Sequence, residues 1–199
     1  MADFKIENSL KGVVAGIDEA GRGPLCGPVV AAAVIFLKQD QNFIYEINDS
    51  KKLSKKKRAE LYKKIISNND IIFSQAIVNN DIIDKVNIFN ATKIAMQQAY
   101  DRLKLKADHI LIDGKFKMIK SENAIAVIKG DSLSLSIAAA SIIAKQVRDN
   151  IMLDLDALFP EYKWSKNQGY GTKEHLEAID KFGITKYHRF SFSPIKNKA

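Results

Sequence analysis

Two apolar segments, separated by a short charged and glycine-rich stretch, constrain this chain most strongly. Residues 13–17 lead directly into Asp18 and Glu19, and residues 29–37 are entirely apolar. Strands that are buried on both faces have such continuous apolar runs, so strands inside a sheet are predicted at residues 13–18 and 29–37. Charged side chains are rarely buried without a partner. We therefore predict that Asp18 and Glu19 form a functional acidic pair at the end of the first strand.

The rest of the chain alternates between short apolar runs and amphipathic stretches. Three further strands are predicted at residues 71–78, 109–112 and 124–128. Helices are predicted from the Ser54 cap to about residue 67, at 90–103 and 132–159, and from the Thr172 cap to residue 182. This order is typical of an α/β fold with a mixed sheet that helices cover on both faces. We expect a single domain over residues 1–199, with a short lead-in at 1–12 and a basic, partly extended tail from about residue 187.

The composition favours a soluble protein with an anionic partner. The formal net charge is +8, which makes nucleic acid the commonest candidate partner, although a surplus of solvated lysines explains the charge equally simply. No apolar run reaches the roughly 18 to 20 residues that a membrane span needs, and the first residues lack the layout of a signal peptide. The lone cysteine, Cys26, suits a reducing compartment. A cytoplasmic location without membrane attachment is therefore expected.

Two more carboxylates follow apolar runs. Asp113 ends one run just before Gly114, and Asp131 follows another. Functional groups in open α/β sheets gather at strand ends, so these two should converge with Asp18 and Glu19. Four such negative charges repel one another unless cations are present, and oxygen ligands suit Mg²⁺ or Mn²⁺. Taken singly, Asp113 is also explained as a turn residue and Asp131 as a helix N-cap.

Three other features suggest contacts with a substrate. The turn at Gly21, Arg22 and Gly23 either permits a tight strand exit or lets a ligand approach the backbone, with Arg22 suited to phosphate. Tyr170 stands between two glycines, which is plausible for stacking on a sugar or base. The basic run at 51–58 is either a phosphate contact or a solvated surface. The three histidines show no metal-ligand spacing, and packing is the simpler interpretation of His188 and its neighbour.

Together these segments closely resemble ribonuclease HII, an endonuclease family that cuts the RNA strand of RNA–DNA hybrids. The resemblance runs from about residue 16 to residue 194, and it is carried by GIDEAGRGPLCGPVVAAAV, NDSKKLS, NIFNATKIAM, LIDGK, KGDSLSLSIAAASIIAKQVRD, GYGTKEHL and YHRFSFSP. The first and fifth segments are long and specific.

The resemblance implies a ribonuclease H-like fold, with a five-stranded mixed sheet flanked by helices. It implies that the catalytic, metal-binding residues are Asp18, Glu19, Asp113 and Asp131. Two divalent ions, Mg²⁺ or Mn²⁺, are expected with substrate. The resemblance further implies that the substrate-binding residues are Gly21, Arg22 and Gly23 for the ribose 2′-hydroxyl, Lys51 for a phosphate, and Tyr170 for the following sugar.

The implied activity includes cleavage at a single ribonucleotide in duplex DNA, leaving a 5′-phosphate and a 3′-hydroxyl. Ribonucleotide excision repair and DNA replication are the processes that this activity suits, and a monomer is expected. The chain departs from the family pattern at Lys115 and at Asn167-Gln168, where a basic contact is missing, and it ends soon after SFSP.

Three alternatives remain. The sister family, ribonuclease HIII, has a substrate-binding domain before the catalytic one, whereas about a dozen residues precede the first strand here. A non-catalytic hybrid-binding module would bind substrate without cutting it. A different nuclease on the same sheet would cut all-DNA duplexes.

Overall fold

A five-stranded mixed sheet forms the centre of the computed structural model, which describes residues 2–198. The strands are β1 (Val14–Ala20), β2 (Val29–Phe36), β3 (Ile71–Val78), β4 (His109–Asp113) and β5 (Ala124–Val127). Their order in the sheet is β3-β2-β1-β4-β5. The β1–β2 and β2–β3 pairs are antiparallel, whereas the β1–β4 and β4–β5 pairs are parallel. The predicted fold class is confirmed.

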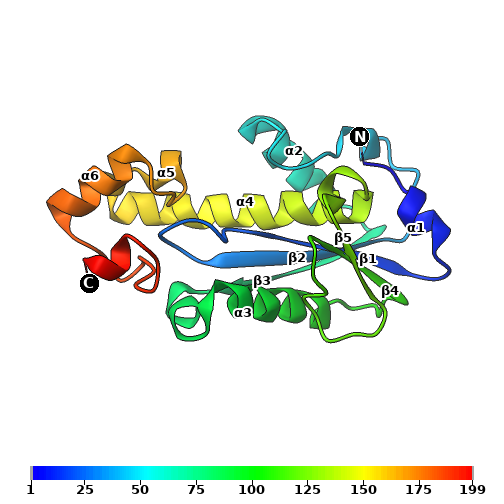
Figure 1. Cartoon of the computed structure of the whole chain (residues 1–199). Helices are drawn as coiled ribbons and strands as arrows, with labels where there is room; N and C mark the ends of the chain where they lie inside the picture. The colour runs from blue at the N-terminus through cyan, green and yellow to red at the C-terminus, as the bar shows by residue number, and fades with distance from the viewer. Residues whose placement is uncertain (1, 199) are drawn as a thin grey trace.

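Helices cover both faces of this sheet (Figure 1). The α-helices are α1 (Lys5–Ser9), α2 (Lys55–Ile66), α3 (Asn80–Asp101), α4 (Leu135–Leu158), α5 (Trp164–Asn167) and α6 (Lys173–Phe182). Short 3-10 turns are η1 (Ile44–Glu46), η2 (Gly130–Ser132), η3 (Pro160–Tyr162) and η4 (Ile195–Asn197). The long α4 and the shorter α2 lie on one face, and α3 lies on the other. None of the helices in residues 2–198 is long and apolar enough to cross a bilayer.

Strand β2 shows why its sequence is apolar throughout. Val30, Ala32 and Val34 pack into the core beneath α2 and α4. The alternate residues, among them Ala31 and Ala33, pack into the core beneath α3. Successive side chains of a strand point to opposite faces, so a strand covered on both sides must be apolar at every position. The prediction of a doubly buried strand is confirmed.

A glycine lets α4 pack closely on β1. A Cβ atom on Gly16 would lie 2.2 Å from the backbone carbonyl carbon of Ser136, at the start of α4. Any larger residue would push the helix away from the strand. The close contact sets the position of α4 relative to Asp18, two residues further along β1.

The predicted helix at 90–103 is too short. Helix α3 begins at Asn80, ten residues earlier, and contains a kink at Asn87, where φ is +67°. Asn87 accepts a hydrogen bond from the backbone N–H of Asn90 at 3.0 Å, which caps the second part of the helix. Asparagine tolerates positive φ better than most residues, so the chain kinks at this one non-helical residue, which separates two helical segments. The sequence pattern revealed only the part beyond this bend.

Two further boundaries differ from the prediction. Strand β1 continues to Ala20, so Glu19 lies within the strand rather than directly after it. Helix α4 is capped by Ser134, whose hydroxyl accepts a hydrogen bond from the Ile137 N–H at 3.2 Å. The alternative of Asp131 as N-cap is therefore wrong.

The tail is more closely packed than predicted. Cys26 forms an isolated antiparallel bridge with His188, and Ile195 is fully buried in the core near α6. The Asp84 carboxylate accepts hydrogen bonds from the backbone N–H groups of Phe190 and Ser191, both at 2.9 Å. The segment is therefore a docked part of the fold and not an extended strand.

Candidate active site

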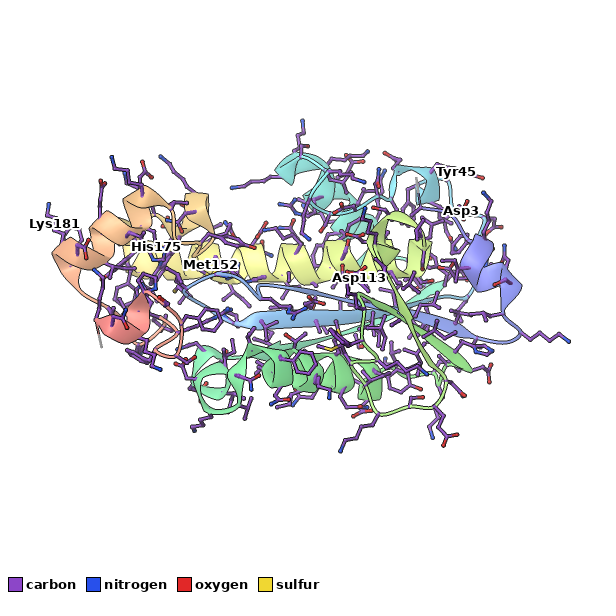
Figure 2. All side chains as sticks on the ribbon, viewed as in Figure 1. Asp3, Tyr45, Asp113, Met152, His175 and Lys181 are labelled. Carbon is purple, nitrogen blue, oxygen red and sulfur yellow. The ribbon has the colours of Figure 1, made fainter. Side chains whose placement is uncertain are left out.

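The parallel pairing of β1 and β4 brings two of the predicted carboxylates together. Ile17 is paired with Ile112, and the next residues along the two strands are Asp18 and Asp113. The Asp113 Oδ1 atom accepts a hydrogen bond of 2.7 Å from the Gly130 N–H, which joins the end of β4 to the turn that carries Asp131. Figure 2 shows Asp113 near the centre of the molecule, between the sheet and α4.

The electrostatics show that all four predicted carboxylates influence one another. Asp18 is buried, and the pKa of its carboxyl is raised well above the usual value by burial and then by the charges of Glu19, Asp113 and Asp131. A hydrogen bond of 2.7 Å from the Glu19 N–H to Asp18 Oδ1 opposes this increase only in part. Burial also raises the pKa of Glu19, and burial followed by the Asp113 charge raises the pKa of Asp131. The group therefore repels itself and favours binding of a positive charge.

Lys51 is exposed beside this acidic group. Partial burial lowers the pKa of its ammonium, but the carboxylates of Asp18, Asp49, Asp131 and Asp113 outweigh this effect, and the net shift is upward. Asp49, whose charge also raises the pKa of Asp131, is a fifth nearby carboxylate that sequence reasoning did not assign. Lys51 is thus a charged group at the rim of the site and is free to contact an anion.

The donor set fits hard divalent cations. Carboxylate oxygens are the ligands that Mg²⁺ and Mn²⁺ favour, and their mutual repulsion is relieved by a bound cation. Within residues 2–198, no three His, Cys, Asp or Glu side chains lie close enough together to hold a metal ion as they stand. The four carboxylates therefore do not form a ready-made ligand cluster, although their charges act on one another.

The glycine-rich turn and the predicted stacking residue lie against each other. A Cβ atom on Gly23 would be 3.3 Å from the Tyr170 ring, although the two residues are far apart in the sequence. Tyr170 is 49% exposed, so its ring is available to a ligand. The Arg22 guanidinium lies 3.5 Å from the Glu19 carboxylate, which connects the turn to the acidic group. The structure thus brings the predicted substrate-binding residues to the side of the carboxylates.

Two buried arginines hold this turn in place: Arg148, to which the sequence analysis gave no role, and Arg189, for which it favoured packing. Arg148 in α4 is buried and donates hydrogen bonds to the carbonyl oxygens of Pro28, Gln168 and Cys26, at 3.1, 3.0 and 3.0 Å. A Cβ atom on Gly21, where φ is +97°, would lie 2.1 Å from the Arg148 Nε atom, so only glycine fits there.

Arg189 completes the support of the turn. It is fully buried and donates to the carbonyl oxygens of Gly21, Arg22, Gly27 and Pro28, at 2.6, 2.9, 3.0 and 3.2 Å. Burial is the main reason why its pKa falls to about 9. In both cases carbonyl groups satisfy a buried cation, which is an arrangement that no local sequence pattern reveals.

A buried histidine pair lies beneath Tyr170. His175 Nδ1 is 2.9 Å from the Tyr170 carbonyl oxygen, and its Nε2 accepts a hydrogen bond of 2.9 Å from the Trp164 indole. His188 Nδ1 accepts from the Thr185 N–H at 2.9 Å, and His188 Nε2 lies 3.2 Å from His175 Nε2. These contacts are consistent only with two neutral rings, in which His188 donates to His175 and His175 donates to Tyr170. Packing, rather than a phosphate contact, is confirmed for His188.

The basic run at 51–58 divides between the two predicted roles. Arg58 is buried and forms an ion pair of 2.8 Å with Asp149 in α4. Lys57 pairs with Glu46 and Glu60. These residues fasten α2 to its neighbours, and Lys51 and Lys52 are the residues of the run whose charges act on the carboxylates.

The model of the ribonuclease HII family matches residues 15–195. This chain belongs to the ribonuclease HII family. It is 57% identical over 180 residues to ribonuclease HII of Rickettsia akari, an alignment that covers 90% of this chain and 91% of that one. It is 50% identical over 198 residues to ribonuclease HII of a Wolbachia endosymbiont of Brugia malayi, covering 99% and 96%. Ribonuclease HIII is thereby excluded as the family.

The solved structures agree on the fold. Ribonuclease H2 from Pyrococcus horikoshii superposes with a TM-score of 0.77 at 26% identity, covering 93% of this chain and 96% of that one. Bst-RNase HIII in complex with Mn²⁺ superposes with a TM-score of 0.75 at 20% identity, covering 94% and 68%. This ribonuclease HII family member is therefore a hydrolase of the nuclease class with ribonuclease H activity.

Proposed function

We propose that this protein is an endoribonuclease that hydrolyses the RNA strand of RNA–DNA hybrids and cuts at single ribonucleotides in duplex DNA. One observation carries the proposal. Asp18, Glu19, Asp113 and Asp131 form one mutually repelling group directly beside the turn at residues 21–23. An acidic group that would bind cations, next to a turn that would contact a ribose, suits hydrolysis of the phosphodiester bond beside a ribonucleotide.

The four carboxylates would hold two divalent ions, Mg²⁺ or Mn²⁺. When bound, such ions activate a water molecule and stabilise the oxygen that departs from phosphorus. Water then supplies the new oxygen on phosphorus and the P–O3′ bond breaks, leaving a 5′-phosphate and a 3′-hydroxyl. The neighbouring Mn²⁺ complex of Bst-RNase HIII supports this choice of ion class.

The remaining site residues select and hold the substrate. The backbone of Gly21 and Gly23, with the guanidinium of Arg22, would contact the ribose 2′-hydroxyl, which distinguishes RNA from DNA. Tyr170, which lies against Gly23, would pack on the next sugar. Lys51 would hold a phosphate beside the carboxylates. We take the protein to act as a monomeric, single-domain enzyme in the cytoplasm.

Cleavage of three labelled duplexes tests the proposal: an RNA–DNA hybrid, a DNA duplex with one ribonucleotide, and an all-DNA duplex, each with Mg²⁺ and with Mn²⁺. We expect cleavage of the first two only. Retained binding without cleavage by either ion would favour the hybrid-binding module. Cleavage of the all-DNA duplex would favour a different nuclease activity.

A further inference from the structure

An exposed aromatic pair lies just beyond the acidic edge of the sheet. Phe116 follows Asp113 by three residues, and its ring lies 5.9 Å from that of Phe89 in α3, edge to face. Phe116 is 62% exposed and Phe89 37% exposed, so neither ring is part of the core. The Lys93 ammonium lies 5.3 Å from the centre of the Phe89 ring. The pair is therefore a surface feature that the packing of the fold does not explain.

A groove of about 560 Å³ borders this pair, between α3 and the segment that joins β4 to β5. Its floor includes the buried side chains of Met118 and Ile119. Its rim carries Lys93, Lys117 and Lys120. We name the two phenylalanines and this groove the aromatic–lysine groove.

The lysines of the groove have no ion-pair partner. Within residues 2–198, no carboxylate lies within salt-bridge distance of Lys93, Lys115, Lys117 or Lys120. By contrast, the lysines of α2 pair with Glu46 and Glu60. Unpaired cations around aromatic rings are complementary to a sugar–phosphate chain, because phosphates meet the ammonium groups and sugars meet the ring faces.

The end of the groove beside Phe89 and Phe116 lies toward the sheet edge that carries the carboxylates. Strand β3 runs in the direction of β1 and β4, since two antiparallel pairings separate β3 from β1. Helix α3 starts directly after β3, and Phe89 is in its first half. The segment with Phe116 starts directly after β4. A duplex that reaches Asp113 can therefore continue onto the groove.

We propose that the aromatic–lysine groove binds the part of the nucleic-acid duplex that flanks the cut. The lysines would contact phosphates, and Phe116 would pack against a sugar of the strand that leaves the carboxylates. The proposal rests on the proposed function, because it extends the same substrate beyond the acidic edge. It adds a contact surface on the α3 face that is separate from the residues around Tyr170.

The salt dependence of binding tests whether the lysines of the groove contact phosphates. A hybrid duplex that extends beyond the acidic edge is titrated in a chelator, so that binding is measured without cleavage. The variant Lys93→Gln/Lys117→Gln should lower the slope of log affinity against log salt by about 2, because two phosphate contacts are lost. The matched control is Lys104→Gln/Lys106→Gln, which removes the same charge from exposed positions between α3 and β4, at the opposite sheet edge. Equal slope changes in both variants would overturn the proposal.

The proposed contact between Phe116 and a sugar is tested by a substitution that leaves the charge of the groove unchanged. Phe116→Ser should weaken binding about fivefold to tenfold without changing the salt slope. The matched control is Phe182→Ser, since Phe182 is 52% exposed and the Lys181 ammonium lies 5.0 Å from the centre of its ring. Phe182 is the last residue of α6, at the opposite end of the molecule from β4 (Figure 1). Wild-type affinity in Phe116→Ser, or an equal loss in Phe182→Ser, would contradict the sugar contact.

The two proposals fail in different ways. If the wild type binds and cuts the hybrid while the groove variants match their controls, only the groove assignment fails. If the wild type binds the hybrid without cutting it, the proposed function fails. The comparison of salt slopes between the lysine variant and its control still tests whether the groove binds the duplex. If the wild type does not bind nucleic acid, both are wrong.

Discussion

The Arg189 guanidinium donates a hydrogen bond of 2.6 Å to the carbonyl oxygen of Gly21, joining the docked C-terminal segment to the glycine turn. The same side chain contacts the carbonyl of Arg22 at 2.9 Å. The conformation of the proposed ribose-reading turn therefore depends on a residue 168 positions away in the sequence. All the hydrogen bonds of this guanidinium go to carbonyl groups, so replacing Arg189 should alter the shape of the turn.

Arg189→Lys should lower kcat/KM at a single ribonucleotide by about tenfold or more, because one ammonium cannot reach four carbonyl oxygens and unsatisfied buried acceptors cost about 1–3 kcal/mol each. Steady-state kinetics and thermal unfolding separate the two effects. Added guanidinium should partly restore cleavage by Arg189→Ala. Arg102→Lys is the control, since Arg102 donates to the Gln75 carbonyl at an exposed position. No guanidinium rescue would contradict a positioning role.

Asp18→Asn should abolish cleavage while the fold is kept, because the amide has the shape of the carboxylate but not its charge. The substitution should also change how the stability of the metal-free protein depends on pH. The pKa of Asp18 in the folded protein lies above its ordinary value of 3.8, so the wild type loses stability as pH rises from about 3.8 through the raised pKa. The variant should lack this loss.

Divalent ions should stabilise the wild type because they offset the same repulsion. Thermal unfolding at neutral pH should shift upward when Mn²⁺ or Mg²⁺ is added, and removal by chelator should reverse the shift. Asp18→Asn should show a much smaller shift. An equal shift in both proteins, or near-normal activity of the variant, would remove Asp18 from the proposed metal ligands.

His188 should make the protein sensitive to acid. Burial, followed by the charge of His175, lowers the pKa of His188 from 6.5 to about 4. Between these values the unfolded chain binds more protons, so stability falls as pH drops from about 6.5 to about 4, by up to about 3 kcal/mol. The pH dependence of the unfolding free energy should be smaller in His188→Gln over this window. An identical slope in wild type and variant would show that other groups cause the acid loss.

Tyr170→Ala should impair cleavage at a single ribonucleotide more than cleavage within a long RNA tract, because a tract offers many alternative positions for the cut. We expect a difference of about tenfold between the two substrates, measured as the ratio of kcat/KM. Tyr45→Ala is the control, since Tyr45 is exposed on a different part of the molecule (Figure 2). Equal losses on both substrates would argue against the proposed sugar contact.

Much of the fold was predictable because local sequence patterns determine where its strands and helices form. The apolar run at 29–36 has to be buried on both faces, and β3 was predicted with its observed bounds, Ile71–Val78. The caps at Ser54 and Thr172 were also correct, because a hydroxyl at an N-cap acts on its own helix. The start of α3 was missed because the kink at Asn87 interrupts the helical pattern.

The sequence by itself determined the chemistry available to this protein: four carboxylates next to apolar strands, a glycine turn and a tyrosine between glycines. Only the tertiary structure decided which of these groups meet. The parallel pairing of β1 with β4 puts Asp18 beside Asp113, and Arg148 and Arg189 join the turn to distant segments. Such contacts depend on strand order and on buried hydrogen bonds between residues far apart in the chain. Neither strand order nor these hydrogen bonds can be predicted from the hydrophobic periodicity of the sequence.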